Sequence, residues 1–189
     1  YPPGFVMYLV LCKAWTLLFG FLDFTRAVHL FSAACAAGAA GALGAATSAW
    51  LRTREGLLKV VDGPGDARLD ELCGAGAGML AATGFTFWFS GTYAKGYALL
   101  YLVLALLLWR MIVAAGSRRP RDFTIVAVLI GLAWQAHPSA SGAGLGLLLF
   151  VGVHVRELGA RGTAWRAALA AAVALGPSRV LLPLLTSGE

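Results

Sequence analysis

Residues 28–50 read VHLFSAACAAGAAGALGAATSAW, and residues 97–109 read YALLYLVLALLLW. Neither run contains an Asp, Glu, Lys or Arg. A helix rises about 1.5 Å per residue, so about 20 apolar residues are enough to cross the hydrocarbon core of a bilayer. Both runs therefore predict membrane-spanning helices. The fold class that they indicate is all-α, a polytopic transmembrane helix bundle.

The composition of the chain supports this fold class. Of its 189 residues, 59% are hydrophobic and 13% are charged, whereas about a quarter of the residues in a soluble domain are charged. The apolar runs also lack the alternation that is typical of strands in a membrane β-barrel. The net charge of +6 comes from cations between the apolar runs. This pattern indicates contact with membrane lipids and no nucleic-acid partner.

The three cysteines, Cys12, Cys35 and Cys73, are scattered through apolar segments. They show neither CxxC spacing nor the Cys/His spacing of a metal site, so the sequence predicts no zinc site and no disulfide framework. We therefore expect buried thiols, no metal site and no cofactor within these residues.

Six spans are expected, at residues 26–50, 72–91, 96–115, 123–136, 140–155 and 165–183. A shorter apolar segment, residues 5–20, carries Lys13 near its middle and predicts a helix that lies along the membrane interface. Asp23 follows this segment and is expected to cap the N-terminus of the first span. Residues 1–189 are together expected to form a single transmembrane domain.

The first span is rich in Ala and Gly. Small residues recur every four positions along it in two rows, Ala34, Gly38 and Ala42, and Ala37, Gly41 and Ala45. Small side chains at this spacing let helix backbones approach closely, so we expect neighbouring helices to pack along these rows.

The distribution of cations predicts the orientation of the bundle. Eleven of the fifteen Lys and Arg residues lie in or beside the expected loops 51–71, 116–122 and 156–166, namely Arg52, Arg54, Lys59, Arg68, Arg110, Arg118, Arg119, Arg121, Arg156, Arg161 and Arg166. Positively charged loops stay in the cytoplasm. We therefore expect a multi-pass protein of the inner membrane, with these three loops cytoplasmic and Lys13, Arg26, Lys95 and Arg179 facing outward.

The outward side gathers polar residues from distant parts of the chain. Cations with almost no acid among them suit an anionic ligand such as a lipid phosphate. The predicted substrate-binding residues are Lys13, Arg26, Lys95, Tyr97 and His137. Asp23 and Glu189 are the carboxylates expected to face outward, and Asp23 is a weak candidate for a catalytic base. Simpler roles are also open for the cations, because Lys13 and Arg26 can reach lipid headgroups and Lys95 can be solvated in a turn.

Five motifs in order resemble those of a bacterial family of multispanning proteins related to the protein O-mannosyltransferases. They are YPPGFVMYLVLCKAW (1–15), FTRAVHLFSA (24–33), FWFSGTYAKGYAL (87–99), GLAWQAHPS (131–139) and LGPSRVLLPLLTSGE (175–189). The family positions that match are Pro2, Pro3, Gly4, Lys13, Arg26, Ser32, Trp88, Ser90, Tyr97 and His137. Three positions depart from the family pattern: Tyr1 replaces a His, His29 replaces an Asn and Lys95 replaces a Glu.

The resemblance implies a glycosyltransferase of the GT-C fold, with its active site on the outer face of the membrane. Such enzymes transfer a sugar, here expected to be mannose-like, from a polyprenyl-phosphate carrier to a protein or lipid acceptor. The family's catalytic acid lies in the first external loop, before the Pro-Pro-Gly segment. Since the chain begins at Tyr1 without an initiator Met, we expect a fragment that lacks this loop, an upstream span and a downstream part. The catalytic residue is then expected upstream of Tyr1.

A non-enzymatic lipid or solute transporter, or a membrane scaffold, is the alternative. The expected short spans 123–136 and 140–155 meet at HPSASGAG (137–144), which is typical of the broken helices at transporter binding sites. No Asp or Glu lies within an expected span, however, and ion-coupled transport usually needs one.

Overall fold

The computed structural model describes residues 6–53, 67–84, 89, 96–136, 140, 154, 158–159 and 161–175, and the regular elements within these ranges are all helical. They are α1 (Val6–Leu18), α2 (Phe24–Thr53), α3 (Ala67–Thr83), α5 (Tyr97–Ser117), α6 (Pro120–Ala136) and a helix over residues 161–175. The predicted all-α class is thereby confirmed.

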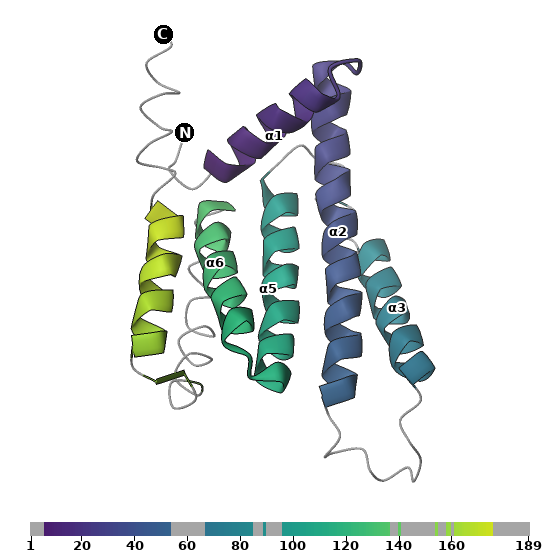
Figure 1. The fold of residues 1–189 in the computed structure, drawn as a ribbon. Coiled ribbons are helices and arrows are strands. Elements are labelled where there is room, and N and C mark those ends of the chain that lie inside the picture. The colour runs from purple at the N-terminus through teal and green to yellow at the C-terminus, as the bar shows by residue number, and fades with distance from the viewer. Residues whose placement is uncertain are drawn as a thin grey trace.

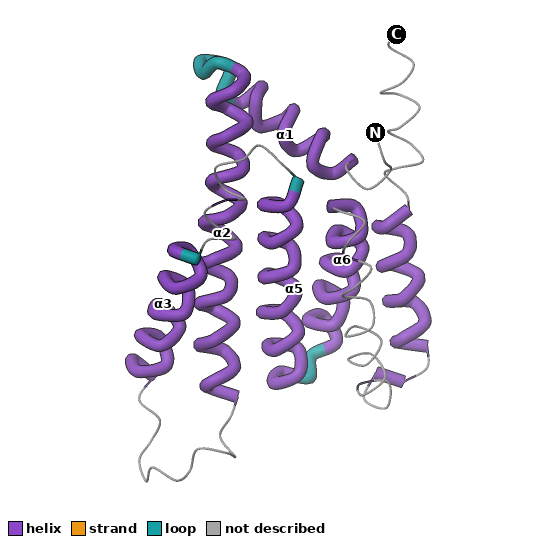
Figure 2. Tube along the Cα trace, turned by 180° about the vertical axis from the view of Figure 1, so that it is seen from behind, coloured by secondary structure: helices purple, strands orange, loops and turns teal. Residues whose placement is uncertain are grey.

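The helices stand side by side in the order 161–175, α6, α5, α2 and α3 (Figure 1). α1 crosses obliquely over one end of this row, and the view from behind shows the same order (Figure 2). α2 is the central element, because it contacts α3 on one side, α5 on the other and α1 at its N-terminal end.

Two of the described helices are long and apolar enough to cross a membrane. They are α2, with a mean hydropathy of 1.5, and α5, with a mean hydropathy of 2.3. These helices coincide with the expected spans 26–50 and 96–115. α3 and α6 have 17 residues each, and the expected span 140–155 falls almost wholly outside the described residues.

The loops are shorter than the charge pattern indicated. α2 continues to Thr53 and α3 begins at Ala67, so both ends of the expected loop 51–71 are helical. Between α5 and α6 only Arg118 and Arg119 lie outside a helix, and residues 161–166 of the third expected loop are helical as well. The expected loop bounds were placed where the charged residues begin. The helices continue into these residues, because Arg and Glu are good helix formers.

α2 and α3 approach so closely that their backbones touch. A Cβ atom on Gly44 would lie 2.7 Å from the carbonyl oxygen of Gly74, and one on Gly78 would lie 3.0 Å from the carbonyl oxygen of Ala40. The hydroxyl of Ser48 donates a hydrogen bond to the carbonyl of Asp70 at 3.0 Å. This contact leaves Cys73 on the outer side of α3, where it is exposed rather than buried as expected.

The predicted rows of small residues on α2 were therefore only partly right. Gly38 and Ala42 of the first row do face α5, where a Cβ on Gly38 would lie 3.0 Å from the Leu102 side chain. At Gly41 of the second row, an added Cβ would have no neighbour within 4 Å. The residues of α2 that contact α3 lie one position before those of the second row, namely Ala40, Gly44 and Ser48. The rotation of α2 about its axis differs from the expected one because α2 packs against α3 and α5 at the same time.

A buried ion pair closes the turn between α5 and α6. The guanidinium of Arg110 donates to the carboxylate of Asp122 at 2.6 Å, and the hydroxyl of Ser117 donates to its other oxygen at 2.5 Å. The side chain of Asp122 is 6% exposed and that of Arg110 is 22% exposed. Asp122 also lies in the first turn of α6, where the helix dipole favours a negative charge.

We predict that Gly74→Ala destabilises the bundle by about 1–3 kcal/mol, as overpacking of a tight contact does. The added methyl group would meet Ser48 and the carbonyl oxygen of Gly44. Gly76→Ala is the matched control in the same helix, because nothing lies within 4 Å of its Cβ position. The control should be neutral or stabilising by up to about 1 kcal/mol. Unfolding of the full-length protein in detergent micelles measures both, and equal effects would contradict the prediction.

We also predict that Asp122→Asn lowers the free energy of unfolding by about 3 kcal/mol, because it leaves the largely buried Arg110 without a counter-charge. Glu71→Gln is the matched control, since it breaks the Arg52–Glu71 pair, whose side chains are 50% and 68% exposed. Such a surface pair contributes less than about 1 kcal/mol. The same unfolding experiment compares them, and a loss in Asp122→Asn no larger than in the control would refute the prediction.

Candidate functional site

The predicted site residues that the structure describes lie at the end of the bundle that α1 crosses. Lys13 is on α1, Asp23 directly precedes α2, Arg26 is in the first turn of α2 and Tyr97 begins α5. The start of α2, the start of α5 and the whole of α1 lie at this end (Figure 1). Lys95 and His137, the other two predicted residues, fall outside the described residues. The role of all six stays a prediction.

Asp23 and Arg26 form a local pair at the N-terminus of α2. The Asp23 carboxylate accepts a hydrogen bond from the backbone N–H of Arg26 at 2.9 Å, and its other oxygen lies 2.9 Å from Nε of Arg26. The predicted N-cap is confirmed by the first of these bonds. Both side chains are exposed, Arg26 at 80% and Asp23 at 55%. The carboxylate is therefore engaged on two sides while the guanidinium keeps further N–H donors for a ligand.

Aromatic side chains hold α1 against the bundle. The rings of Tyr8 and Trp15 lie 5.8 and 5.7 Å from the ring of Phe31 on α2. Cys12, between them on the same face of α1, is buried in a cluster with apolar residues of α2, α5 and α6. Lys13 stands on the exposed side of α1, because the helical spacing that turns residues 8, 12 and 15 inward turns the next position outward.

Two polar groups on the inward face of α1, the Tyr8 hydroxyl and the Cys12 thiol, carry no charge at neutral pH. Burial raises the pKa of the Tyr8 hydroxyl above its ordinary value. Burial also raises the pKa of the Cys12 thiol. Both groups therefore stay protonated, and the Lys, Arg, Asp and Glu residues described at this end are Lys13, Asp23 and Arg26. Their sum is one positive charge, which can attract an anionic group.

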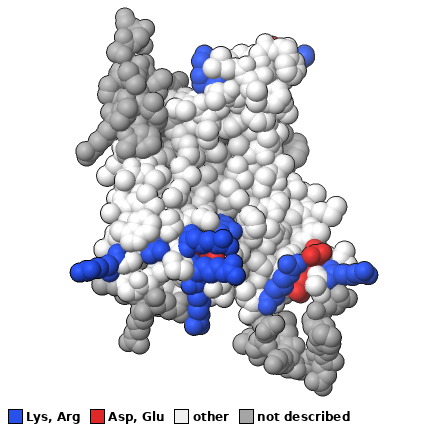
Figure 3. All heavy atoms as spheres, in the orientation of Figure 1, with Lys and Arg blue, Asp and Glu red and all other residues white. Residues whose placement is uncertain are grey.

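The opposite end of the bundle carries most of the charge. We call it the basic end; its described cations are Arg52, Arg68, Arg110, Arg118, Arg119, Arg121, Arg161 and Arg166. Figure 3 shows Lys and Arg at both ends of the molecule and an uncharged band between them. Those of the expected loop cations that the structure describes are thus gathered at one end of the bundle. The membrane face that this end meets stays a prediction.

The sequence did not predict two polar contacts between helices. Gln135, 2% exposed, donates from its side-chain N–H₂ to the carbonyls of Val173 and Ala174, so it joins α6 to the helix over 161–175. Arg166 of that helix donates to the carbonyl of Pro120 at 2.9 Å. An isolated Gln or Arg inside an apolar helix signals a buried partner, but nothing in the sequence says which carbonyl it reaches.

No group of three His, Cys, Asp or Glu residues that could hold a metal ion occurs within the described ranges. Two surface hollows among the described helices lie elsewhere, one between α2 and α5 at the basic end and one between α2 and α3. At the α1 end, the described cations Lys13 and Arg26 are exposed, and the rings of Tyr8, Trp15 and Phe31 pack between α1 and α2.

Comparison with known families and proteins gives one match. Residues 1–141 match the family model described as the Protein O-mannosyl-transferase TMEM260 N-terminal domain. The match takes in α1 to α6 and both candidate membrane spans, together with all six predicted site residues. No curated protein and no solved structure matches the chain.

We predict that Asp23 acts as a helix cap. Asp23→Asn should change stability by only a few tenths of a kcal/mol, because Asn caps as well as Asp, whereas Asp23→Ala should cost about 1 kcal/mol. Unfolding of both variants in detergent micelles makes the comparison. If the Asn variant were as unstable as the Ala variant, the negative charge rather than the cap would be what Asp23 contributes.

Proposed function

Because the chain belongs to the family of the protein O-mannosyl-transferase TMEM260 N-terminal domain, we propose that it is part of a membrane glycosyltransferase of the GT-C type. The observation that carries the proposal is the family match over residues 1–141. The proposed donor is a mannose-like sugar on a polyprenyl-phosphate carrier, and the proposed acceptor is a hydroxyl group of a protein or lipid. We place the reaction at the α1 end, on the outer face of the inner membrane.

The charges at the α1 end support this placement. In the proposed reaction the acceptor oxygen attacks the anomeric carbon, the bond from that carbon to the phosphate oxygen breaks, and a carboxylate takes the hydroxyl proton. Negative charge then develops on the leaving lipid phosphate. Exposed Arg26 and Lys13 supply N–H donors that can stabilise this charge. Tyr97, 41% exposed at the start of α5, would contact the sugar or the acceptor.

Asp23 is poorly suited to be the base. Its carboxylate is already bonded to the backbone and to the guanidinium of Arg26, and a base must be free to accept a proton from the acceptor. We therefore assign the proton transfer to a carboxylate elsewhere in the full-length enzyme. The transporter alternative depended on residues 137–144, most of which fall outside the described residues, and no described feature favours it.

We predict that Arg26→Ala lowers kcat/KM for sugar transfer about tenfold or more, which is the effect of losing a hydrogen bond to a charged group. Transfer from polyprenyl-phosphate mannose is measured with the full-length protein in membranes. Arg26→Lys should recover part of the activity because it restores the charge.

Arg121→Ala is the matched control, since Arg121 is an exposed arginine at the basic end and should leave the rate unchanged. Equal turnover of Arg26→Ala and wild type would remove Arg26 from the mechanism. No turnover with any polyprenyl-linked sugar would refute the glycosyltransferase proposal itself.

A further inference from the structure

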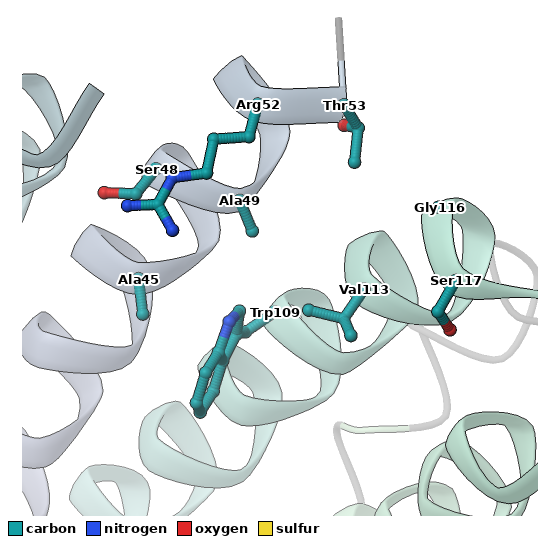
Figure 4. A pocket seen from close by; sticks show the side chains of 9 residues that line it. All are labelled: Ala45, Ser48, Ala49, Arg52, Thr53, Trp109, Val113, Gly116 and Ser117. Atoms are coloured by element: carbon teal, nitrogen blue, oxygen red, sulfur yellow. The ribbon is translucent and has the colours of Figure 1, made fainter. Parts of the chain in front are cut away.

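A groove opens between α2 and α5 at the basic end, away from the proposed reaction site. Its volume is about 790 Å³, within the range of small-molecule sites. Small and apolar residues form its walls, with Ala45 and Ala49 on α2 and Trp109 and Val113 on α5. In Figure 4, Ala49 of α2 lies across the hollow from Trp109 and Val113 of α5, and the Arg52 side chain runs along α2 beside Ser48.

The groove changes from polar to apolar along its length. Arg52, Thr53, Gly116 and Ser117 line it where α2 and α5 end. Trp109 lies eight residues earlier on α5, which is about 12 Å deeper along the helix axis. A ligand that fits both parts has a polar head at the helix ends and an apolar tail alongside Trp109.

The charge at the rim selects the sign of the head group. Arg52 is in the last turn of α2, and its side chain is 50% exposed. It donates one hydrogen bond to Glu71 at 2.8 Å, but an exposed pair of this kind is weak. A guanidinium has five N–H donors, so Arg52 can bind a phosphate in addition to the carboxylate.

Trp109 is held in a setting typical of a membrane interface. The guanidinium of Arg110 lies 5.9 Å from the centre of the Trp109 ring, and Arg110 is fixed in turn by Asp122. α2 and α5 are the two candidate membrane spans, and Trp is enriched near the ends of such helices.

We propose that this groove binds an anionic phospholipid, with its phosphate at Arg52 and an acyl chain alongside Trp109. Arg52 is the arginine in the lining of the groove, and its positive charge complements a negative head group. A second copy of the chain in the same membrane would bring its own basic end against this one, and like-charge repulsion disfavours that occupant.

Quenching of tryptophan fluorescence by brominated lipids tests the proposal. The full-length protein is reconstituted in phosphatidylcholine that contains an equal mole fraction of either brominated phosphatidylglycerol or brominated phosphatidylcholine. The Trp109 signal is the difference between wild type and Trp109→Phe. We expect about fivefold preferential quenching by phosphatidylglycerol, the effect of one arginine on an anionic lipid. Equal quenching by both lipids, or none by either, would overturn the proposal.

Variants at the rim separate the groove from the general surface charge. Arg52→Gln should abolish the preference and Arg52→Lys should keep part of it. Glu71→Gln should raise the preference, because it removes the competing carboxylate. Arg121→Gln, the matched control, removes an exposed arginine of the basic end that does not line the groove and should leave the preference unchanged.

Three outcomes would refute the assignment. One is an unchanged preference in Arg52→Gln, and another is an equal loss in Arg121→Gln, which would show a surface effect. The third is a competition result, in which added unbrominated polyprenyl phosphate relieves the quenching more than unbrominated phosphatidylglycerol does. That result would make the groove a binding site for the polyprenyl-phosphate carrier. None of these outcomes bears on sugar transfer at the α1 end, so the two proposals stand or fall separately.

Discussion

The contact between the backbones of α2 and α3 constrains the rest of the bundle. A side chain at Gly44 or Gly74 would collide with main-chain or near-backbone atoms of the other helix, so the distance between the two axes is fixed by the absence of side chains. Lipid tails are as apolar as Leu, and close packing of small residues therefore replaces the hydrophobic effect as the force that joins helices in a membrane. α2 can pack against α3 and α5 at the same time because small residues lie on both of the faces that it presents to them.

The arrangement of α2 and α5 places the charges. α2 and α5 lie side by side and run in the same direction, so both candidate spans begin at the α1 end and finish at the basic end (Figure 1). The turn that follows α5 is closed by the Arg110–Asp122 pair, which joins α6 to the row. Of the described residues, the α1 end has a short helix and few charges, whereas the basic end has most of the cations and a groove lined in part by Arg52.

The sequence predicted the features that depend on neighbouring residues. The helical class and the cores of the spans 26–50 and 96–115 follow from local hydropathy, and the N-cap at Asp23 follows from a contact three residues away. The sequence also predicted that one end of the bundle holds Lys13, Asp23, Arg26 and Tyr97, because successive expected spans cross the membrane in opposite directions. The loop bounds were wrong because charged residues continue the helices. The exposure of Cys73 was missed because it depends on which side of α3 meets α2.

By itself, the sequence determined the class of fold, the family and the segregation of cations to one end, because these depend on composition and on the order of residues along the chain. The tertiary structure alone decided that Gly44 rather than Gly41 meets α3, that Gln135 bonds the carbonyls of the helix over 161–175, and that α2 and α5 diverge into a groove beside Trp109. Each of these depends on the rotation and register of one helix against another. Those are set by many weak contacts between residues far apart in the sequence, and no local pattern records them.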